Sequence, residues 1–408
     1  MSTTTARTSK DTRARTERPG SRPRTYATLM PRVRDYTDLA LRGLPASFIT
    51  DTLEFSQTVR ESSTSETAEL SREGRNLRYA AIVALGLATV AEETQRSVLH
   101  GSTATDLVDA AIRRATTSRD PGAIALVAWA AAEVNGEPNA KLLERIAHLL
   151  DSGDPLPTVD TAWMLTAAVA SLTINHTTPR AADVARISRE RLLGAQGTEG
   201  IFPHALPPTA LGRLRAHVGC FADQVYPIQA LARLAAFTTD PEALAAANLA
   251  AARICELQGE AGQWWWHYDA RDGSVVEKYP VYSVHQHAMA PMALLDLANS
   301  GGDDHTDAIF LGLDWLRTHP EVDDELVSEE YALIWRKAGR REPAKAARKI
   351  AAVTTSIRPG WHLPGIDTVF PANRIDRECR PYELGWLVYA WRDVDGDTSS
   401  SFAEGPQS

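Results

Sequence analysis

The sequence QGEAGQW at residues 258–264 decides the fold, because an earlier stretch of the chain has the same pattern. QGTEGIF at residues 196–202 has a glutamine, a glycine and an aromatic residue at the same spacing, 62 residues earlier. The same offset places Gln224 on Gln286. Agreement at one fixed period in two separate segments is the signature of a repeated supersecondary unit. The sequence therefore predicts a structural unit that occurs at least twice.

Helices of two alternating kinds surround this repeat. One kind is alanine-rich and apolar around its circumference, as in AIALVAWAAA at 123–132, and is typical of buried helices. The other kind carries a charged face, as in NAKLLERIAHLL at 139–150, and is typical of a solvent-exposed layer. The apolar periodicity and the Pro, Gly, Asp and Asn breaks predict helices near residues 79–93, 104–116, 122–134, 139–151, 160–173, 180–195, 222–238, 240–257, 284–298, 304–318, 328–338, 343–355 and 382–392.

This alternation of buried and exposed helices predicts an all-α fold, an α/α toroid (barrel) of six to seven helical hairpins over residues 76–392. Residues 1–34 are rich in Ser, Thr and Arg and poor in apolar residues, so a disordered basic tail is expected there. Residues 35–75 are expected to form a partly helical N-terminal extension, and residues 393–408 a second disordered tail.

The composition excludes several classes of protein. A net charge of −9 with 44% hydrophobic residues is typical of a globular protein and argues against a dedicated nucleic-acid binder. No stretch approaches the roughly 20 apolar residues that a membrane-spanning helix needs, so no integral membrane segment is expected. The three cysteines are odd in number and far apart, which indicates reduced thiols and a cytoplasmic location. The oligomeric state is left open.

A metal site receives little support from the sequence. The cysteines Cys220, Cys255 and Cys379 and the nearby His217 do not have the spacing of a zinc-binding motif. GGDDHTD at 301–307 contains three acidic residues, but they stand at the start of an expected outer helix. We therefore expect no cofactor, while a divalent metal stays an open alternative.

The starts of the inner helices are the predicted location of the chemistry. In a toroid these helix starts gather around one mouth, where helix N-termini favour negative groups. The acidic candidates for catalysis at such positions are Asp160, Asp223, Glu329 and Glu383. Each has an alternative interpretation, because a carboxylate that caps a helix stabilises it by about 1 kcal/mol without any catalytic role.

The segment YPVYSVHQH at 279–287 is the most unusual in the chain. It places His285 at the repeat position of Asp223. Imidazole is not a favoured helix cap and titrates near neutral pH, so His285 is the candidate general base or acid. Tyr282 is the candidate proton donor. The competing interpretation is that these rings only pack in the loop.

The three adjacent tryptophans divide into two groups. Trp264 matches Phe202 in the repeat and is expected to be structural. Trp265 and Trp266 have no counterpart one repeat earlier and are expected to face a substrate. The other candidate binding residues are polar or aromatic and lie at helix starts or in loops: His267, Gln286, His287, Arg380, Trp361 and Gln224.

The Q-x-x-x-G-x-W element resembles the repeat of the terpenoid cyclase and protein prenyltransferase superfamily, whose members are α/α toroids. That resemblance implies structural roles for Gln258 and Trp264. Cyclases that protonate an alkene have an acidic run in which the middle Asp is the acid. The corresponding stretch here is PTVDTA, with Val159 at the position of the acid and Asp160 following.

The chain is also similar in general character to the six-hairpin carbohydrate enzymes, whose sites combine stacking aromatics with His, Tyr, Arg and carboxylates. The predicted function is therefore an enzyme that acts on a glycan or sugar, as a hydrolase, lyase or epimerase, with a small molecule or oligosaccharide as its substrate. Elimination or epimerisation would use His285 with Gln286 and either Arg380 or Arg374. Hydrolysis would instead use two carboxylates from the set Asp160, Asp223, Glu329, Glu330, Asp376 and Glu383. The alternatives are an enzyme of the terpenoid cyclase or prenyltransferase type that acts on an isoprenoid, and a non-catalytic binding scaffold.

Overall fold

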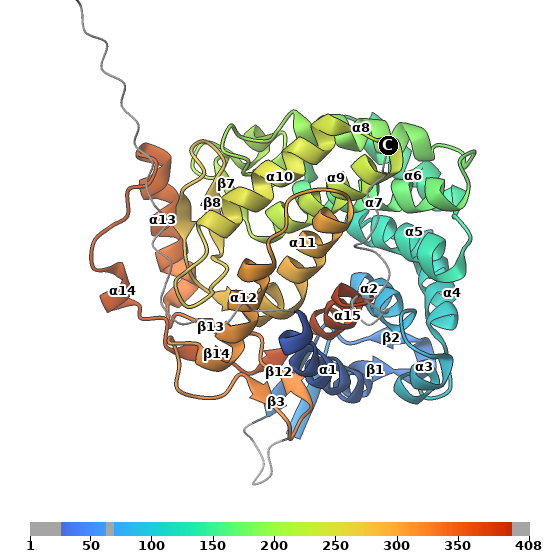
Figure 1. The fold of residues 1–408 in the computed structure, drawn as a ribbon, viewed down its shortest axis with the longest axis horizontal. Coiled ribbons are helices and arrows are strands. Elements are labelled where there is room, and N and C mark those ends of the chain that lie inside the picture. The colour runs from blue at the N-terminus through green and yellow to red at the C-terminus, as the bar shows by residue number, and fades with distance from the viewer. Residues whose placement is uncertain (1–25, 63–68, 394–408) are drawn as a thin grey trace, which may run out of the picture.

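A closed ring of helices forms the centre of the computed structural model, which describes residues 26–62 and 69–393 (Figure 1). Within these residues six inner helices contact one another in sequence order, and the last contacts the first, which closes the ring. The inner helices are α2 (Leu77–Leu87), α5 (Pro121–Asn135), α7 (Thr158–Ile174), α9 (Ala222–Thr238), α11 (Ala290–Asn299) and α15 (Pro381–Ala390).

A second ring of helices surrounds the first. In the described part of the chain, each inner helix packs against one of six outer helices. The outer helices are α1 (Tyr26–Gly43), α4 (Ala104–Ala115), α6 (Ala140–Asp151), α8 (Ala181–Leu193), α10 (Pro241–Glu256) and α12 (Thr306–Thr318). The predicted all-α toroid is therefore confirmed, with six hairpins.

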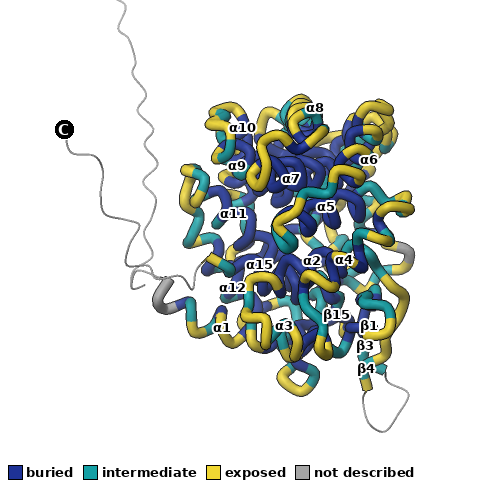
Figure 2. The backbone as a smooth tube through the Cα atoms, turned by 90° about the vertical axis from the view of Figure 1, so that its right-hand side faces the viewer, coloured by how far each residue is buried: buried dark blue, intermediate teal, exposed yellow. Residues whose placement is uncertain are grey.

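Burial follows the two kinds of helix that the sequence distinguishes. In α5 every residue from Gly122 to Ala132 is buried, whereas α6 buries one face and exposes the other. Figure 2 shows the same contrast over the described residues, with buried residues on the inner helices and exposed ones on the outer helices and turns. The core therefore consists of the inner helices and of the faces of the outer helices that pack against them. No helix of the described residues is both long and apolar enough to cross a membrane.

The 62-residue offset is a repeat of structure as well as of sequence. Gln258 donates from Nε2 to the carbonyl oxygens of Gly262 and Ala308, both at 3.0 Å. Gln196 donates in the same way to Gly200 at 3.0 Å and to Ala246 at 2.9 Å, and all three positions are shifted by 62. Each glutamine thus ties the turn after one outer helix to the next outer helix. The turn therefore fixes the spacing of neighbouring hairpins.

Helix α1 belongs to the outer ring, although a tail and an extension were expected in this part of the chain. It begins at Tyr26, inside the predicted 1–34 tail, and packs on α15, the last inner helix. Its residues Leu29, Val33, Leu39 and Ala40 are buried, and this apolar stripe anchors the helix. Residues 1–25 and most of the predicted tail at 393–408 lie outside the described residues.

Short strands accompany the helices, mainly at one end of the toroid. Strands β5, β7, β10 and β15 lead directly into α7, α9, α11 and α15, with a π-helical turn at His285–Met289 between β10 and α11. All sheets have two or three antiparallel strands among the described residues. The strands are β1 (Phe48–Ile49), β2 (Glu54–Phe55), β3 (Thr58–Ser62), β4 (Glu69–Glu73), β5 (Leu156–Pro157), β6 (Ala205–Leu206), β7 (Val218–Cys220), β8 (His267–Asp269), β9 (Val275–Glu277), β10 (Val281–Tyr282), β11 (Val327–Ser328), β12 (Leu333–Ile334), β13 (Lys337–Gly339), β14 (Arg374–Asp376) and β15 (Glu378–Cys379).

The predicted helix at 328–338 is wrong. This segment forms β11, β12 and β13, and its main chain pairs with distant segments. Arg336 N–H donates to the Glu378 carbonyl at 2.9 Å, and Ser283 N–H donates to the Arg336 carbonyl at 2.9 Å. These pairings override the helix propensity of the sequence. The remaining helices are α3 (Glu92–Val98), α13 (Ala346–Ile357) and α14 (Ile366–Val369).

Candidate active site

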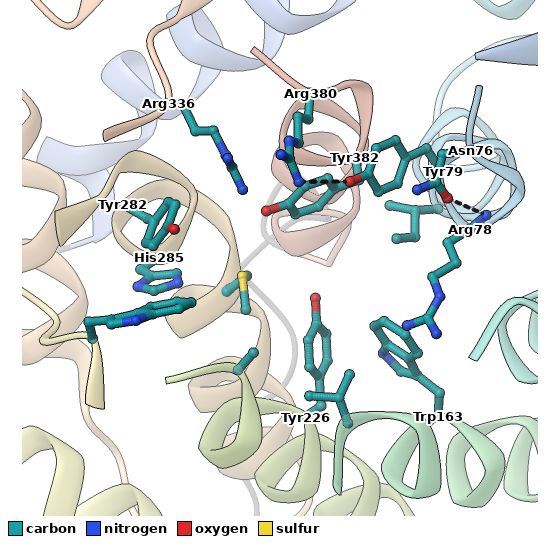
Figure 3. A pocket seen from close by; sticks show the side chains of 15 residues that line it. Asn76, Arg78, Tyr79, Trp163, Tyr226, Tyr282, His285, Arg336, Arg380 and Tyr382 are labelled. Carbon is teal, nitrogen blue, oxygen red and sulfur yellow. Dashed lines mark hydrogen bonds between the residues drawn. The ribbon is translucent and has the colours of Figure 1, made fainter. Parts of the chain in front are cut away.

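A cavity of about 370 Å³ lies at the end of the toroid where the inner helices begin (Figure 3). Its lining comes from four of the inner helices, from the π-helical turn before α11, and from strands and loops that precede inner helices. The lining residues are Asn76, Arg78, Tyr79, Ile82, Val159, Trp163, Ala222, Tyr226, Trp266, Tyr282, His285, Met289, Arg336, Arg380 and Tyr382. Seven of these fifteen side chains carry an aromatic ring, counting the imidazole, and three carry a guanidinium group.

Three rings, Trp266, Tyr282 and His285, form one wall of the cavity. The indole of Trp266 stacks on the His285 imidazole, with centroids 6.0 Å apart and planes 12° apart. The Tyr282 ring lies 4.8 Å from Trp266 and 5.0 Å from His285. These contacts hold each ring in one orientation.

A second aromatic wall faces this one across the cavity in Figure 3. Trp163 and Tyr226 meet edge to face, with centroids 4.9 Å apart. The Tyr226 hydroxyl accepts a hydrogen bond of 2.9 Å from Trp386 Nε1. The Arg78 guanidinium lies over Trp163, at 5.3 Å from the ring centroid, which adds a cation–π contact.

Two carboxylates behind this wall hold Arg78. Its Nε donates to Asp120 Oδ2 at 2.8 Å, and one terminal nitrogen donates to Asp160 Oδ1 at 2.9 Å. Burial raises the pKa of Asp160, while the charge of Arg78 opposes that shift. Neither carboxylate lines the cavity, so the guanidinium separates the negative charge from a bound ligand.

A similar arrangement holds Arg336. Its Nε donates to Glu383 Oε1 at 3.0 Å and its NH1 group donates to Glu378 Oε1 at 2.5 Å. Burial raises the pKa of Glu383, while the charge of Arg336 lowers it. Arg380 donates to the Tyr79 hydroxyl at 3.3 Å, and its Nε is buried without a partner. Among the described residues no carboxylate lines the cavity, so the charged groups facing a ligand are hydrogen-bond donors.

His285 occupies a local distortion of its helix. The Ala290 N–H donates to the His285 carbonyl, five residues before it, which is the hydrogen bond of a π-helical turn. Pro291 lacks an N–H group for the His287 carbonyl, and Trp391 Nε1 donates to that carbonyl at 3.0 Å instead. Burial and the charge of Arg336 hold the pKa of His285 well below its ordinary value. Its imidazole is therefore neutral, with Nδ1 buried and unpartnered.

Four of the residues predicted from the sequence line this cavity: His285, Tyr282, Trp266 and Arg380. Two more, Asp160 and Glu383, lie directly behind it, each ion-paired to a lining arginine. These two acids at helix starts are therefore next to the cavity, but each is bound to an arginine. Both carboxylates accept hydrogen bonds from these arginines, whereas a catalytic carboxylate must be free to contact the substrate.

The other predicted residues lie outside the cavity lining. Glu329 has a 74% exposed side chain and pairs with Arg42, because the helix expected to begin there does not exist. Asp223 is buried and contacts His204. Trp361 is 40% exposed on the loop after α13. The remaining predicted residues are buried in the packing around the cavity: Trp265, His267, Gln286, His287 and Gln224.

The tryptophan run divides differently from the prediction. Trp264 is fully buried and packs against Phe221, as expected of a structural residue. Trp266 lines the cavity. Trp265 contacts Tyr279 and Lys278 and does not line the cavity. One tryptophan of the three therefore reaches the candidate site.

Several cavity residues escape the sequence argument. Arg78 stands at the start of an inner helix, where the predicted catalytic residues are acids and His285. Trp163 and Tyr226 lie one turn further along their helices, on the side that faces the ring centre. Arg336 lies in the segment for which a helix was predicted. Arg78, Trp163 and Tyr226 are polar or aromatic residues in the first two turns of an inner helix, and that position is a signal from which they could be predicted.

Buried histidines next to the cavity make stability depend on pH. Burial lowers the pKa of His287 to about 3, from an ordinary value of 6.5. Below pH 6.5 the unfolded chain therefore binds more protons than the native chain, and the free energy of unfolding falls as the pH falls. His287 alone is expected to contribute a loss of about 2 kcal/mol between pH 7 and pH 5.

Urea denaturation of the wild type and of His287→Gln at pH 8, 7 and 5 measures this contribution. The difference between the two proteins should be the same at pH 8 and 7, and should shift in favour of the variant at pH 5. An equal loss of stability in both proteins would show that His287 titrates normally in the native state.

Comparison with known proteins shows the fold. No protein-family model and no curated protein matches the chain. Among solved structures, the chain is similar to D-mannose isomerase (TM-score 0.55, 9% identity, 89% of this chain and 97% of that one). It is also similar to an unsaturated glucuronyl hydrolase specific for heparin, with a TM-score of 0.52, 12% identity, and coverage of 88% of this chain and 96% of that one. A third similar structure is a family 88 glycosyl hydrolase from Bacteroides vulgatus, with a TM-score of 0.51, 10% identity, and coverage of 89% of this chain and 99% of that one. At these identities the similarity establishes the α/α toroid. The three names agree with the predicted similarity to six-hairpin carbohydrate enzymes, and none is a terpenoid cyclase.

Proposed function

We propose that this protein is an enzyme that binds a sugar in the cavity and transfers a proton on it, in an isomerisation, epimerisation or elimination. The observation that carries the proposal is the neutral imidazole of His285, held between aromatic rings near the Arg336 guanidinium. A neutral imidazole can accept a proton, and a guanidinium can stabilise the negative charge that develops on an adjacent oxygen.

The composition of the wall favours a sugar as the ligand. Aromatic faces such as those of Trp266 and Trp163 pack against the C–H faces of a sugar ring, while Arg78, Arg336 and Arg380 donate to its oxygens. The enzymes named above have the same fold, and by their names they act on sugars. This supports a sugar ligand by analogy only.

Proton transfer fits the charges better than hydrolysis does. A glycosidase of the common type needs two carboxyl groups, about 5–5.5 Å apart for retention and about 6.5–9.5 Å apart for inversion, on either side of the bond that breaks. The nearest acids, Asp160 and Glu383, are instead bound to Arg78 and Arg336. We therefore assign these acids the role of fixing the two arginines.

In the proposed reaction the neutral imidazole of His285 accepts the proton from the carbon next to a carbonyl or carboxylate. The electron pair moves to that oxygen, where Arg336 stabilises the enolate. Tyr282 lies between these two groups, 5.0 Å from each, and supplies a hydroxyl for the proton that returns. Return of the proton to carbon gives an epimer or isomer, and loss of a leaving group gives an elimination product.

Ligand-induced stabilisation tests the proposal. A ligand that binds only the native state raises the melting temperature, by an amount that grows with its concentration relative to the Kd. The probes are neutral monosaccharides, uronic acids, oligosaccharides and isoprenoid diphosphates. We expect a sugar to stabilise the wild type and Trp361→Leu alike. This effect should be lost in Trp266→Leu, which removes one of the three rings that form the first wall of the cavity.

Three outcomes would contradict the proposal. Stabilisation by isoprenoid diphosphates alone would favour the terpenoid alternative. Stabilisation of Trp266→Leu to the same extent as the wild type would place the sugar outside this cavity. Binding without any proton exchange on the bound sugar would leave a binding scaffold as the function.

A further inference from the structure

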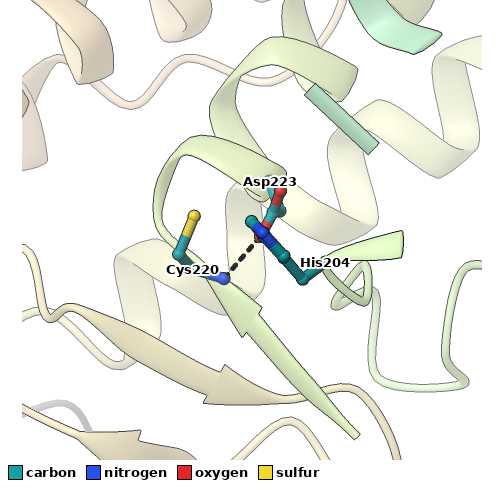
Figure 4. Close-up of side chains that lie close together, drawn as sticks. All are labelled: His204, Cys220 and Asp223. Atoms are coloured by element: carbon teal, nitrogen blue, oxygen red, sulfur yellow. Dashed lines mark hydrogen bonds and ion pairs between the residues drawn. The ribbon is translucent and has the colours of Figure 1, made fainter. Parts of the chain in front are cut away.

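A second cluster of reactive side chains lies beside the candidate active site, at the start of α9 (Figure 4). It consists of His204, Cys220 and Asp223. A ring nitrogen, a thiol sulfur and a carboxylate oxygen of these residues all lie within 4.8 Å of one another. Ala222, next to Asp223, lines the cavity of the candidate active site.

The repeat gives this cluster a defined place in the fold. His204, Cys220 and Asp223 stand 62 residues before Trp266, Tyr282 and His285. The later three residues are the aromatic wall of the cavity. The neighbouring hairpin unit thus carries, at the same three positions, a nitrogen, a sulfur and an oxygen ligand. The cluster therefore occupies, in its own repeat, the positions that the aromatic wall of the cavity occupies in the next one.

The backbone fixes the cluster in place. The His204 N–H donates to the Val218 carbonyl at 3.0 Å, and its own carbonyl accepts from the Thr158 N–H at 3.1 Å. Cys220 ends strand β7 and Asp223 lies in the first turn of α9. Three different local structures therefore converge on one point.

The Asp223 carboxylate is only partly satisfied. Its side chain has 0% exposure. Oδ2 accepts from the Cys220 N–H at 2.7 Å and lies 2.8 Å from His204 Nδ1. Oδ1 is buried and has no hydrogen-bond partner in the chain. A buried carboxylate oxygen without a partner is costly, and a bound cation is one of the recognised ways to satisfy it.

We infer that His204, Cys220 and Asp223 bind a divalent transition-metal ion of the zinc type. Imidazole nitrogen, thiolate sulfur and carboxylate oxygen are the ligands that Zn²⁺ takes in proteins. Three protein ligands leave one coordination position open, and the 42% exposed side chain of His204 marks the side from which an ion enters. The Cys220 thiol gives its proton to solvent when the metal binds, because the thiolate is the ligand.

Cobalt substitution tests this site on the full chain. Co²⁺ reports a sulfur ligand through a thiolate-to-cobalt charge-transfer band in the near ultraviolet, and Zn²⁺ competes for the same ligands. After treatment with a chelator, the wild type is expected to bind one Co²⁺ per chain with this band. Addition of Zn²⁺ should abolish the band. Neither readout depends on a sugar or on catalytic activity, so the proposed function is tested separately.

Three variants assign the ligands. Cys220→Ser should remove the charge-transfer band, and His204→Ala should lower metal affinity by at least the 10- to 100-fold that follows loss of an outer-shell partner. His204 is partly exposed, so its replacement leaves the core intact. Cys255→Ser is the matched control, since this second thiol has no part in the cluster and should leave the band unchanged.

Two results would overturn the inference. Failure of the folded wild type to bind Co²⁺ or Zn²⁺ would mean that the cluster is a hydrogen-bonded pair beside a protonated thiol. Retention of the band in Cys220→Ser together with its loss in Cys255→Ser would place the metal elsewhere. Circular dichroism of each variant identifies any loss of metal that follows from unfolding.

Discussion

His285→Asn is expected to lower the rate of proton transfer on the bound sugar by about a thousandfold, within the 10²- to 10⁴-fold range of general acid–base catalysis. Asparagine keeps a polar side chain next to Trp266 and Tyr282 but has no basic nitrogen. The expected readout is the rate at which a carbon-bound hydrogen of the sugar exchanges with deuterium in D₂O, followed by NMR. The sugar is the one that stabilises the wild type.

The change in kcat should exceed the change in KM. His285 acts on the transferred proton, whereas the arginines and the aromatic walls supply the contacts that bind the substrate. The expected kcat/KM therefore falls mainly through kcat. An unchanged exchange rate in a folded His285→Asn protein would exclude this residue as the base.

His319→Asn is the matched control for this prediction. His319 is as buried as His285, at 5% against 3% exposure, but it ends α12 and does not line the cavity. Its Nδ1 lies 3.1 Å from the Val322 carbonyl, a contact that the asparagine amide can replace. The exchange rate of this variant is expected to equal that of the wild type. A similar loss in both variants would indicate damage to the fold.

The two rings of helices could be predicted because their signals are local. The apolar circumference of α5 and the one-sided α6 follow from residues that are near in sequence. The segment at 328–338 could not be predicted in this way. Its partners are Glu378 and Ser283, more than 40 residues away on either side, and strands of two or three residues leave no measurable alternation.

Residues of the candidate site could be predicted only where the 62-residue repeat or the start of an inner helix singled them out. The offset of 62 singled out His285, which lines the cavity. The acids at helix starts, Asp160 and Glu383, are close to the cavity, but their pairing with arginines depends on contacts between distant segments. Arg336 is the clearest case of a site residue that could not be predicted. It lines the cavity because strand β13 follows it, whereas the local sequence predicts a helix there.

Gly262→Ala is expected to lower the free energy of unfolding by about 4 kcal/mol or more. Gly262 has a φ of +102°, which an L-residue rarely adopts. A Cβ atom at this position would lie 2.0 Å from the Leu311 carbonyl oxygen, which belongs to the backbone of α12. The turn and the next outer helix would have to move apart. That movement would break the hydrogen bond from Gln258 to Ala308.

A graded set of glycine variants separates backbone strain from this clash. Gly101 has nearly the same φ, +101°, but a Cβ added there would have no atom within 4 Å, so Gly101→Ala should cost only the roughly 1–2 kcal/mol of the left-handed conformation. Gly200, the repeat partner of Gly262, would place its Cβ 2.7 Å from the Leu249 carbonyl oxygen, and Gly200→Ala should fall between the two. Urea denaturation measures all three. Equal costs for Gly262→Ala and Gly101→Ala would mean that the close contact between turn and outer helix, which the 62-residue repeat encodes, does not stabilise the toroid.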